Sequence, residues 1–105
     1  LLMAAEAHMR SVTKNESLAQ TYLNRVRDRV KMPELNNGGD QLLEDIWAER
    51  RLELSMEGQR FFDLVRTGKA ATEITGFQTG KHEVFPIPQV EIDLAGGNWT
   101  QNNNY

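Results

Sequence analysis

Apolar residues recur at helical spacing through the first two thirds of the chain, and short polar breaks divide this pattern into segments. The face of residues 1–11 carries Leu2, Ala5 and Met9 and extends to Val12. Residues 17–30 have the most regular apolar pattern. The apolar side of this second segment consists of Leu18, Ala19, Tyr22, Leu23, Val26 and Val30. The pattern predicts two antiparallel helices joined by a break at residues 13–15.

Turn-forming residues separate these helices from a second helical region. Pro33 and the Asn36–Gly39 run predict a loop, and Asp40 is suited to cap the helix that follows. We predict a third helix over residues 41–57, with Gly58 either ending or bending it. A fourth helix over residues 60–67 is expected to close at Gly68.

Helical periodicity disappears after residue 69, where Thr and Gly surround an isolated phenylalanine. Pro86 and Pro88 favour extended backbone, and Pro88 can begin a short helical turn over residues 89–94, stopped by Gly96 and Gly97. The Asn-rich tail, residues 98–105, is expected to become ordered only by docking on something larger. The predicted fold is therefore all-α, with antiparallel helix pairs over residues 1–68 and a loop, short helix and tail over residues 69–105.

The segment from residue 48 to 68 carries more charge than a buried helix normally holds. Its spacing places Glu49, Glu53 and Glu57 on one predicted helix face, continued by Arg60. Stacked carboxylates repel one another, so cations should lie among them, and Arg50, Arg51 and Arg60 are the nearest candidates. The pattern predicts an ion-pair lattice at a helix–helix junction.

The same carboxylates invite comparison with a glycosidase acid/base pair or a carboxylate metal site. Neither is favoured, because His8 and His82 lie far from this segment without metal-ligand spacing, and no phosphate loop or nucleophile motif is present. We predict no catalytic residue, metal or cofactor. A carboxylate hydrolase would lose activity in Glu53→Gln while keeping its stability. The structural interpretation predicts the reverse, because removing one partner of a buried pair costs about 3–5 kcal/mol.

Charge and composition limit the remaining classes. A net charge of −3 argues against nucleic-acid binding, so the basic cluster of residues 25–31 (Arg25, Arg27, Arg29, Lys31) is expected to be a solvated helix face. The chain has no cysteine and no apolar run of membrane-spanning length. It begins within a predicted helix and without Met, so we expect it to be a piece of a longer protein, which would carry any sorting or lipid-attachment signal.

The aromatic residues divide into expected core positions and one candidate for ligand contact. Trp47, Phe61, Phe62 and Phe85 fit the core. Trp99 lies among amide residues, and an indole can stack on a sugar ring while amides bind its hydroxyls. Its alternative role is an aromatic pin that docks the tail.

Several motifs in order resemble the SusD/RagB family of nutrient-binding outer-membrane lipoproteins. The charged signature resembles the family's through Glu49-Arg50-Arg51, Glu53-Leu54, Glu57-Gly58, Arg60, Phe62-Asp63-Leu64, Arg66 and Gly68. The alanine-rich helix (Leu2, Ala4, Ala5, Glu6, Ala7) and the segment Tyr22-Leu23-Asn24, Val26, Arg27 resemble two family helices. Phe85-Pro86-Ile87-Pro88, Glu91-Ile92 and the ending Gln101-Asn102 to Tyr105 resemble its closing segment, except that Asn103-Asn104 replace the usual Pro-Gly.

The resemblance implies the last portion of a tetratricopeptide-like α-helical domain whose N-terminal part precedes this chain. It also implies a non-catalytic protein, lipid-anchored at the cell surface on the outer membrane. Such proteins capture oligosaccharides, or in some members peptides, for import through a TonB-dependent SusC-like transporter. The signature residues carry over as scaffold: Glu49, Arg50, Arg51, Glu53, Glu57, Gly58, Arg60, Phe62, Asp63 and Arg66. Trp99 alone is a candidate for ligand contact.

The helical pattern taken alone also fits a helical-repeat module that binds protein partners. The two hypotheses differ in their ligands. Titration of the longer parent protein with glycans would distinguish them, because a repeat module would ignore glycans and bind a protein.

Overall fold

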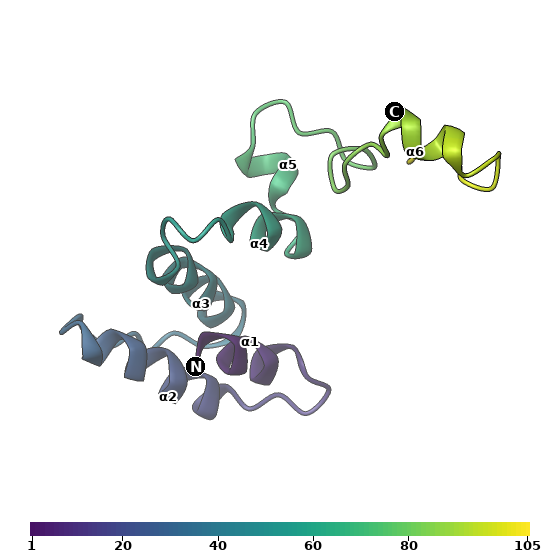
Figure 1. Ribbon diagram of the computed structural model, residues 1–105. Coiled ribbons are helices and arrows are strands. Elements are labelled where there is room, and N and C mark those ends of the chain that lie inside the picture. The colour runs from purple at the N-terminus through teal and green to yellow at the C-terminus, as the bar shows by residue number, and fades with distance from the viewer. The chain divides into compact units, whose positions relative to one another are not determined.

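The computed structural model describes residues 1–105, and helices are its only regular secondary structure. The elements are α1 (Leu2–Arg10), α2 (Glu16–Arg29), α3 (Gly39–Glu53), α4 (Arg60–Arg66), α5 (Ala70–Glu73) and α6 (Gln89–Leu94) (Figure 1). The chain divides into two compact units, Leu1–Arg60 and Phe61–Tyr105. The predicted all-α class is confirmed.

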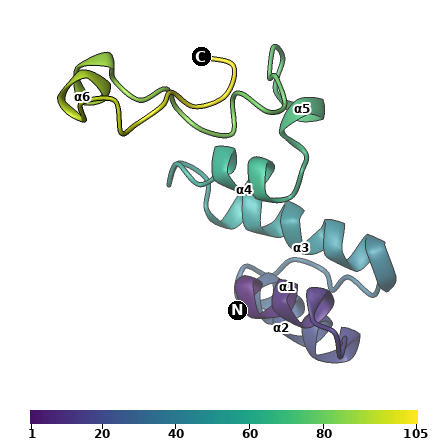
Figure 2. The same ribbon diagram turned by 90° about the vertical axis from the view of Figure 1, so that its right-hand side faces the viewer.

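The first unit consists of α1, α2 and α3, each of which packs against the other two (Figures 1 and 2). Ala5 and Ala19 are fully buried between the antiparallel helices α1 and α2, where small side chains allow close approach. The imidazole of His8 stacks on the Tyr22 ring, with 5.8 Å between the ring centroids. The core of this unit consists of Leu2, Ala5, Met9, Ala19, Leu23, Val26, Leu42 and Ile46.

The connection from α1 to α2 follows the predicted break and ends in a side-chain cap. The Leu18 N–H donates to Asn15 Oδ1 at 3.0 Å, which satisfies one of the free donors at the start of α2. Val12 lies beyond the last residue of α1 and is fully exposed. Its predicted place on the apolar face is wrong, because the helix has already ended.

The loop between α2 and α3 is held by side chains of α2. Asn24 contacts both backbone groups of Leu35: its Nδ2 donates to the carbonyl, and its Oδ1 accepts from the N–H, each at 3.0 Å. Arg27 Nε donates to the Pro33 carbonyl at 2.8 Å. An irregular segment without helical hydrogen bonds is thereby given partners for its backbone.

We expect Asn24→Ala to lower the free energy of unfolding by about 1–3 kcal/mol, because two backbone groups of Leu35 lose their partner. Urea unfolding of the full-length protein measures the change. Asn36→Ala, an exposed amide in the same loop, is the matched control and should change stability by less than about 0.5 kcal/mol. Equal effects of the two variants would show that Asn24 does not hold the loop.

Helix α3 begins differently from the prediction. Gly38, not Asp40, is its N-cap, and the Gly39 N–H donates to Glu16 Oε2 of α2 at 3.0 Å. Gly39 has a φ of +57°, which glycine adopts without a steric penalty. Asp40 lies in the first turn, where its negative charge is still favourable to the helix.

Helix α3 also ends earlier than predicted, at Glu53 rather than at residue 57. Met56 and Gly58 both have positive φ angles, 71° and 73°, so the backbone leaves the right-handed helical region before Gly58. The Met56 side chain is fully exposed. Glu57 therefore does not continue the face that carries Glu49 and Glu53.

The second unit begins with α4, whose end at Gly68 is confirmed. Lys69 N–H donates to the Leu64 carbonyl at 2.8 Å and Gly68 N–H to the Val65 carbonyl at 3.1 Å, with Gly68 at φ +74°. This pair of bonds and the left-handed glycine form a Schellman cap. The short helix α5 follows within a region predicted to be loop, because a single turn is too short to show periodicity. Helix α6 has the predicted bounds.

The tail docks on residues 80–87 of this chain, a turn followed by a short irregular stretch, rather than on something larger. We call residues 101–105 the tail strap. Gln101 contacts both backbone groups of Ile87, accepting from its N–H at 2.7 Å and donating to its carbonyl at 2.8 Å. Three further strap side chains donate to carbonyls of the segment: Asn102 to Phe85 at 2.6 Å, Asn104 to Gly80 at 2.9 Å and Tyr105 to Val84 at 2.9 Å. Side-chain amides thus take the place of a neighbouring strand.

The strap closes with a turn in which the Tyr105 N–H donates to the Asn102 carbonyl at 3.3 Å. Asn104 has a φ of +67°, the left-handed conformation that asparagine tolerates better than most residues. A Pro-Gly pair would suit the same two central positions of such a turn. Asn103-Asn104 therefore retain the turn.

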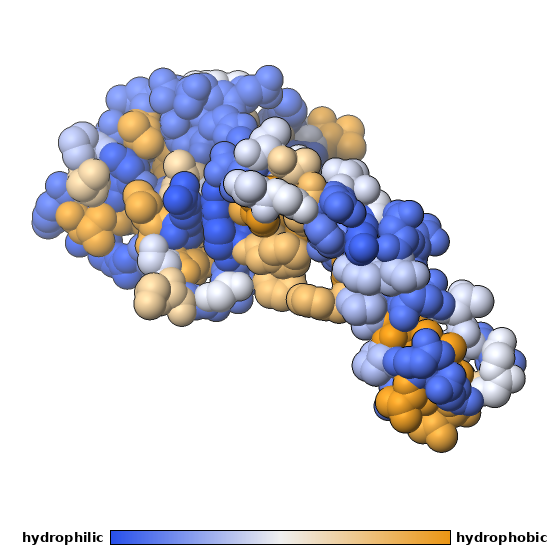
Figure 3. Space-filling view, turned by 90° about the horizontal axis from the view of Figure 1, so that it is seen from above, coloured by the Kyte–Doolittle hydropathy of each residue, from blue (hydrophilic) through white to orange (hydrophobic).

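Two of the four expected core aromatics lie largely in solvent. Phe62 is 62% exposed and Phe85 is 78% exposed, whereas Trp47 and Phe61 are half-buried. The space-filling view shows apolar residues (orange) at the surface (Figure 3). The core prediction for Phe62 and Phe85 is wrong. Hydrophobicity indicates that a side chain tends to be buried, but it does not show which part of the protein would cover it.

Candidate functional site

The charged signature contains a buried ion pair between helices. Glu49 of α3 accepts from Arg27 of α2, with 2.5 Å between Glu49 Oε2 and Arg27 Nη1. The exposed fractions of these side chains are only 7% and 10%. Since Arg27 also donates to Pro33, this one guanidinium joins α2, α3 and the loop between them. The carboxylate thus serves as a link between two helices.

A second, more exposed pair lies one helical turn further along α3. Arg29 Nη2 of α2 donates to Glu53 Oε1 at 2.6 Å and Oε2 at 2.7 Å. The Arg29 side chain is 62% exposed, so water screens this pair. The arginines of both pairs, Arg27 and Arg29, come from the basic cluster on α2, which was predicted to be solvated. That prediction is wrong for Arg27 and correct for exposed Arg25.

The remaining signature residues are spread over three places. Arg50 is half-buried near the end of α3, and Arg51 is exposed. Glu57 and Gly58 are exposed in the turns that follow α3. In α4, Asp63 pairs with Arg66 at 2.8 Å across one helical turn. The structure thus brings Glu49 and Glu53 to arginines of α2, while a single face continuing through Glu57 and Arg60 does not form.

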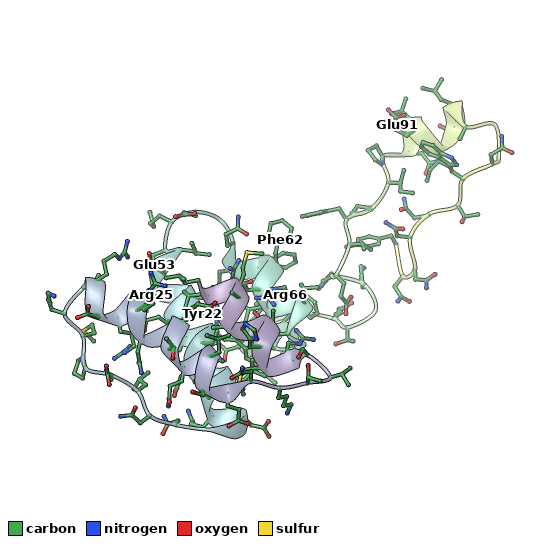
Figure 4. All side chains as sticks on the ribbon, turned by 90° about the horizontal axis from the view of Figure 1, so that it is seen from below. Tyr22, Arg25, Glu53, Phe62, Arg66 and Glu91 are labelled. Carbon is green, nitrogen blue, oxygen red and sulfur yellow. The ribbon has the colours of Figure 1, made fainter.

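A cavity of about 330 Å³ in the first unit lies beside the second pair. Side chains of all three helices line it, and the charged ones include Arg25 and Glu53, both labelled in Figure 4. Its lining is Leu1, Leu2, Met3, Arg25, Val26, Arg29, Arg50, Glu53 and Leu54. Its lining therefore combines apolar side chains with four charged ones.

A second cavity, of about 380 Å³, lies within the second unit and has aromatic walls. We call it the aromatic cavity, and its lining is Phe61, Ile74, Thr75, Gly76, Phe77, His82, Val84, Phe85 and Tyr105. Phe77 contacts two neighbouring rings, with centroid separations of 6.4 Å to Phe61 and 5.7 Å to His82. Tyr105 belongs to the tail strap, so the docked strap forms part of the wall.

Hydrogen bonds fix the polar groups of the aromatic cavity. His82 Nδ1 accepts from the Gln78 N–H at 3.0 Å, so the neutral imidazole carries its proton on Nε2. The Tyr105 hydroxyl donates to the Val84 carbonyl at 2.9 Å and keeps its lone pairs as acceptors. His82 and Tyr105 therefore offer one nitrogen donor and one oxygen acceptor, beside the hydroxyl of Thr75 in the same lining.

Two charges next to the cavity have local partners. The Lys81 ammonium lies over the Tyr105 ring, 4.9 Å from its centroid. The Gly80 N–H donates to Glu83 Oε1 at 2.9 Å and lowers the pKa of this carboxyl below its usual range. Glu83 therefore stays ionised at neutral pH and holds the loop in place.

Trp99, the ligand candidate from the sequence, lies outside both of these cavities. Its side chain is 54% exposed. The amide of Asn98 donates to the Ala95 carbonyl at 2.9 Å and so serves its own backbone. A ligand role for Trp99 stays a prediction.

The structure contains neither a candidate metal site nor a candidate membrane-spanning helix. No group of three or more His, Asp or Glu side chains could hold a metal ion. None of the six helices has both the length and the apolar character of a membrane-spanning segment. Sequence reasoning missed the aromatic cavity, although Phe77, His82 and Phe85 stand close together in the sequence, because only the tail strap brings Tyr105 to them.

Comparisons with known proteins identify the family. The model of the SusD family matches residues 1–105. Two proteins of Formosa agariphila are similar: SusD-like protein P38 is 37% identical over 72% of this chain, and SusD-like protein P2 is 30% identical over 98% of it. The chain spans 16% and 23% of the lengths of these relatives.

A solved structure has the same fold. Surface glycan-binding protein A from Bacteroides thetaiotaomicron matches 97% of this chain with a TM-score of 0.78 and 38% identity, and the chain covers 22% of that protein. The tetratricopeptide-like, all-α fold that the resemblance implied is thus confirmed. This chain belongs to the SusD family.

Proposed function

We propose that the protein containing this chain binds glycans at the cell surface without transforming them. The observation that carries the proposal is the structural match over nearly the whole chain to a surface glycan-binding protein at 38% identity. The pairing of Glu49 with Arg27 joins two helices, which agrees with a scaffold role for the signature.

The proposal extends to compartment and partner. A lipid anchor outside this chain holds the protein on the outer membrane, and a TonB-dependent SusC-like transporter receives the oligosaccharide, or a peptide, that it captures. Membership of the SusD family supports this arrangement.

We also propose that another part of the same protein packs on this chain. The relatives are several times longer, as the chain spans no more than 23% of either. The cavity of the first unit offers that part an apolar lining that includes Leu2, Val26 and Leu54. Burial of such a surface contributes about 25 cal/mol per Å² of apolar area.

Calorimetric titration of the full-length protein, freed of any lipid anchor, tests the function. We expect saturable binding of at least one class among maltohexaose, cellohexaose, xylohexaose and mannohexaose, and no shortening of the oligosaccharide on prolonged incubation. The proposal is wrong if none of these glycans binds and the protein instead captures only a protein partner. Hydrolysis of a bound glycan would equally contradict the non-catalytic part.

A further inference from the structure

The aromatic cavity has the size of a small-molecule site. Its volume of about 380 Å³ lies at the lower end of the range of ligand pockets, about 300–1,000 Å³. All of its lining residues belong to the second unit. This volume suits a single ring of a ligand rather than several.

The walls favour a ligand with an apolar face. Phe85 lines the cavity while 78% of its surface remains exposed, so a bound ring can cover it. Phe77 is half-buried and held between Phe61 and His82. The C–H face of a pyranose is apolar and stacks on such rings, whereas its edges carry hydroxyls that need polar partners.

The polar groups are placed for the edge of that ring. The imidazole of His82 presents an N–H donor and the Tyr105 hydroxyl an acceptor, and both are already held by bonds to the backbone. Groups fixed before binding lose little freedom when the ligand arrives. Lys81, over one face of Tyr105, and Glu83, bound to Gly80, carry opposite charges that offset each other, so a neutral sugar is favoured.

We propose that the aromatic cavity is a subsite for one neutral pyranose ring, stacked on Phe85 and hydrogen-bonded by His82 and Tyr105. This inference rests on the proposed glycan-binding function and assigns part of that function to this chain. The subsite is complete only when the tail strap is docked, since the strap supplies Tyr105.

Phe85→Ala in the full-length protein tests the subsite, with Phe62→Ala as the matched control. Both rings are largely exposed and lie in the same unit, but Phe62 does not line the cavity. In titrations with the four hexaoses named above, we expect Phe85→Ala to weaken the affinity for the bound sugar about tenfold. Phe62→Ala should stay within about twofold.

The results of these titrations distinguish a failure of the proposed subsite from a failure of the proposed glycan-binding function. If the unmodified protein binds a glycan and Phe85→Ala leaves the affinity unchanged, the subsite is wrong while the proposed function stands. If the unmodified protein binds none, the proposed function itself fails. Methyl NMR of Ile74 and Val84, which line the cavity, needs no substitution. Their signals should shift on saturation with the glycan, and unshifted signals would overturn the subsite even if Phe85→Ala failed to fold.

Discussion

Glu49→Gln is expected to lower the free energy of unfolding by about 3–5 kcal/mol, because it leaves the buried Arg27 guanidinium without its counter-charge. The loss should be larger than for an ordinary surface substitution, since both side chains are at least nine-tenths buried. Urea unfolding of the full-length protein, followed by hydrogen exchange of α2 and α3 amides, measures the change.

Glu53→Gln is the matched control for this prediction. It removes the same charge from the same helix, but its partner Arg29 is 62% exposed, so the expected cost is no more than about 1 kcal/mol. The loss of folding that the sequence predicted for Glu53→Gln is therefore not expected, because the pair is not buried. If both variants lost the same free energy of unfolding, burial would not be the reason why the Glu49–Arg27 pair stabilises the fold.

A double variant tests whether the pair is needed as a pair. Arg27→Met combined with Glu49→Leu removes both charges and should recover much of the stability that Glu49→Gln loses, because no unpaired charge stays buried. Recovery should be incomplete, since the Pro33 carbonyl still loses its Arg27 donor. Glycan affinity should be unchanged in every variant that folds.

Gln101→Ala is expected to release the tail strap from residue 87. The substitution removes the partner of both the N–H and the carbonyl of Ile87, at an expected cost of about 1–3 kcal/mol. Hydrogen exchange of the Ile87 amide is the direct measurement, and it should become about 5- to 100-fold faster in the variant.

Asn103→Ala is the control for the strap, because Asn103 belongs to the same tail and is exposed. It should leave exchange at Ile87 unchanged. If Gln101→Ala also leaves this rate unchanged, other contacts hold the segment and the strap does not. Since Tyr105 lines the aromatic cavity, release of the strap should also weaken glycan binding there.

The family motifs gain a physical explanation from the contacts that their residues make. In the second helix, Leu23 and Val26 enter the core, whereas Asn24 and Arg27 hold the loop backbone at Leu35 and Pro33. In the tail, Gln101 contacts Ile87 in the same two-bond manner as Asn24 contacts Leu35. A side-chain amide that pairs with both backbone groups of a distant residue leaves no periodic trace in the sequence.

Local signals explain which predictions succeeded. The bounds of α1, α2, α4 and α6 depend on apolar spacing, capping residues, glycine and proline, whose effects extend over a few residues. The end of α3 was wrong because apolar and charged residues keep helical spacing beyond Glu53, although the backbone turns at Met56. The spacing of apolar and charged residues does not reveal the end of a helix when the residues beyond that end could also form a helix.

The sequence by itself determined the all-α class, most helix bounds and, through ordered motifs, the family. Only the tertiary structure decided that Arg27 pairs with Glu49, that the tail binds residues 80–87, and that Tyr105 completes an aromatic cavity. These contacts join residues far apart in the chain, and their energies depend on burial and on the positions of backbone groups. Short-range sequence patterns contain no information on the burial of a pair or on the position of a distant backbone group. The helical scaffold could therefore be predicted from the sequence, whereas the candidate site could not.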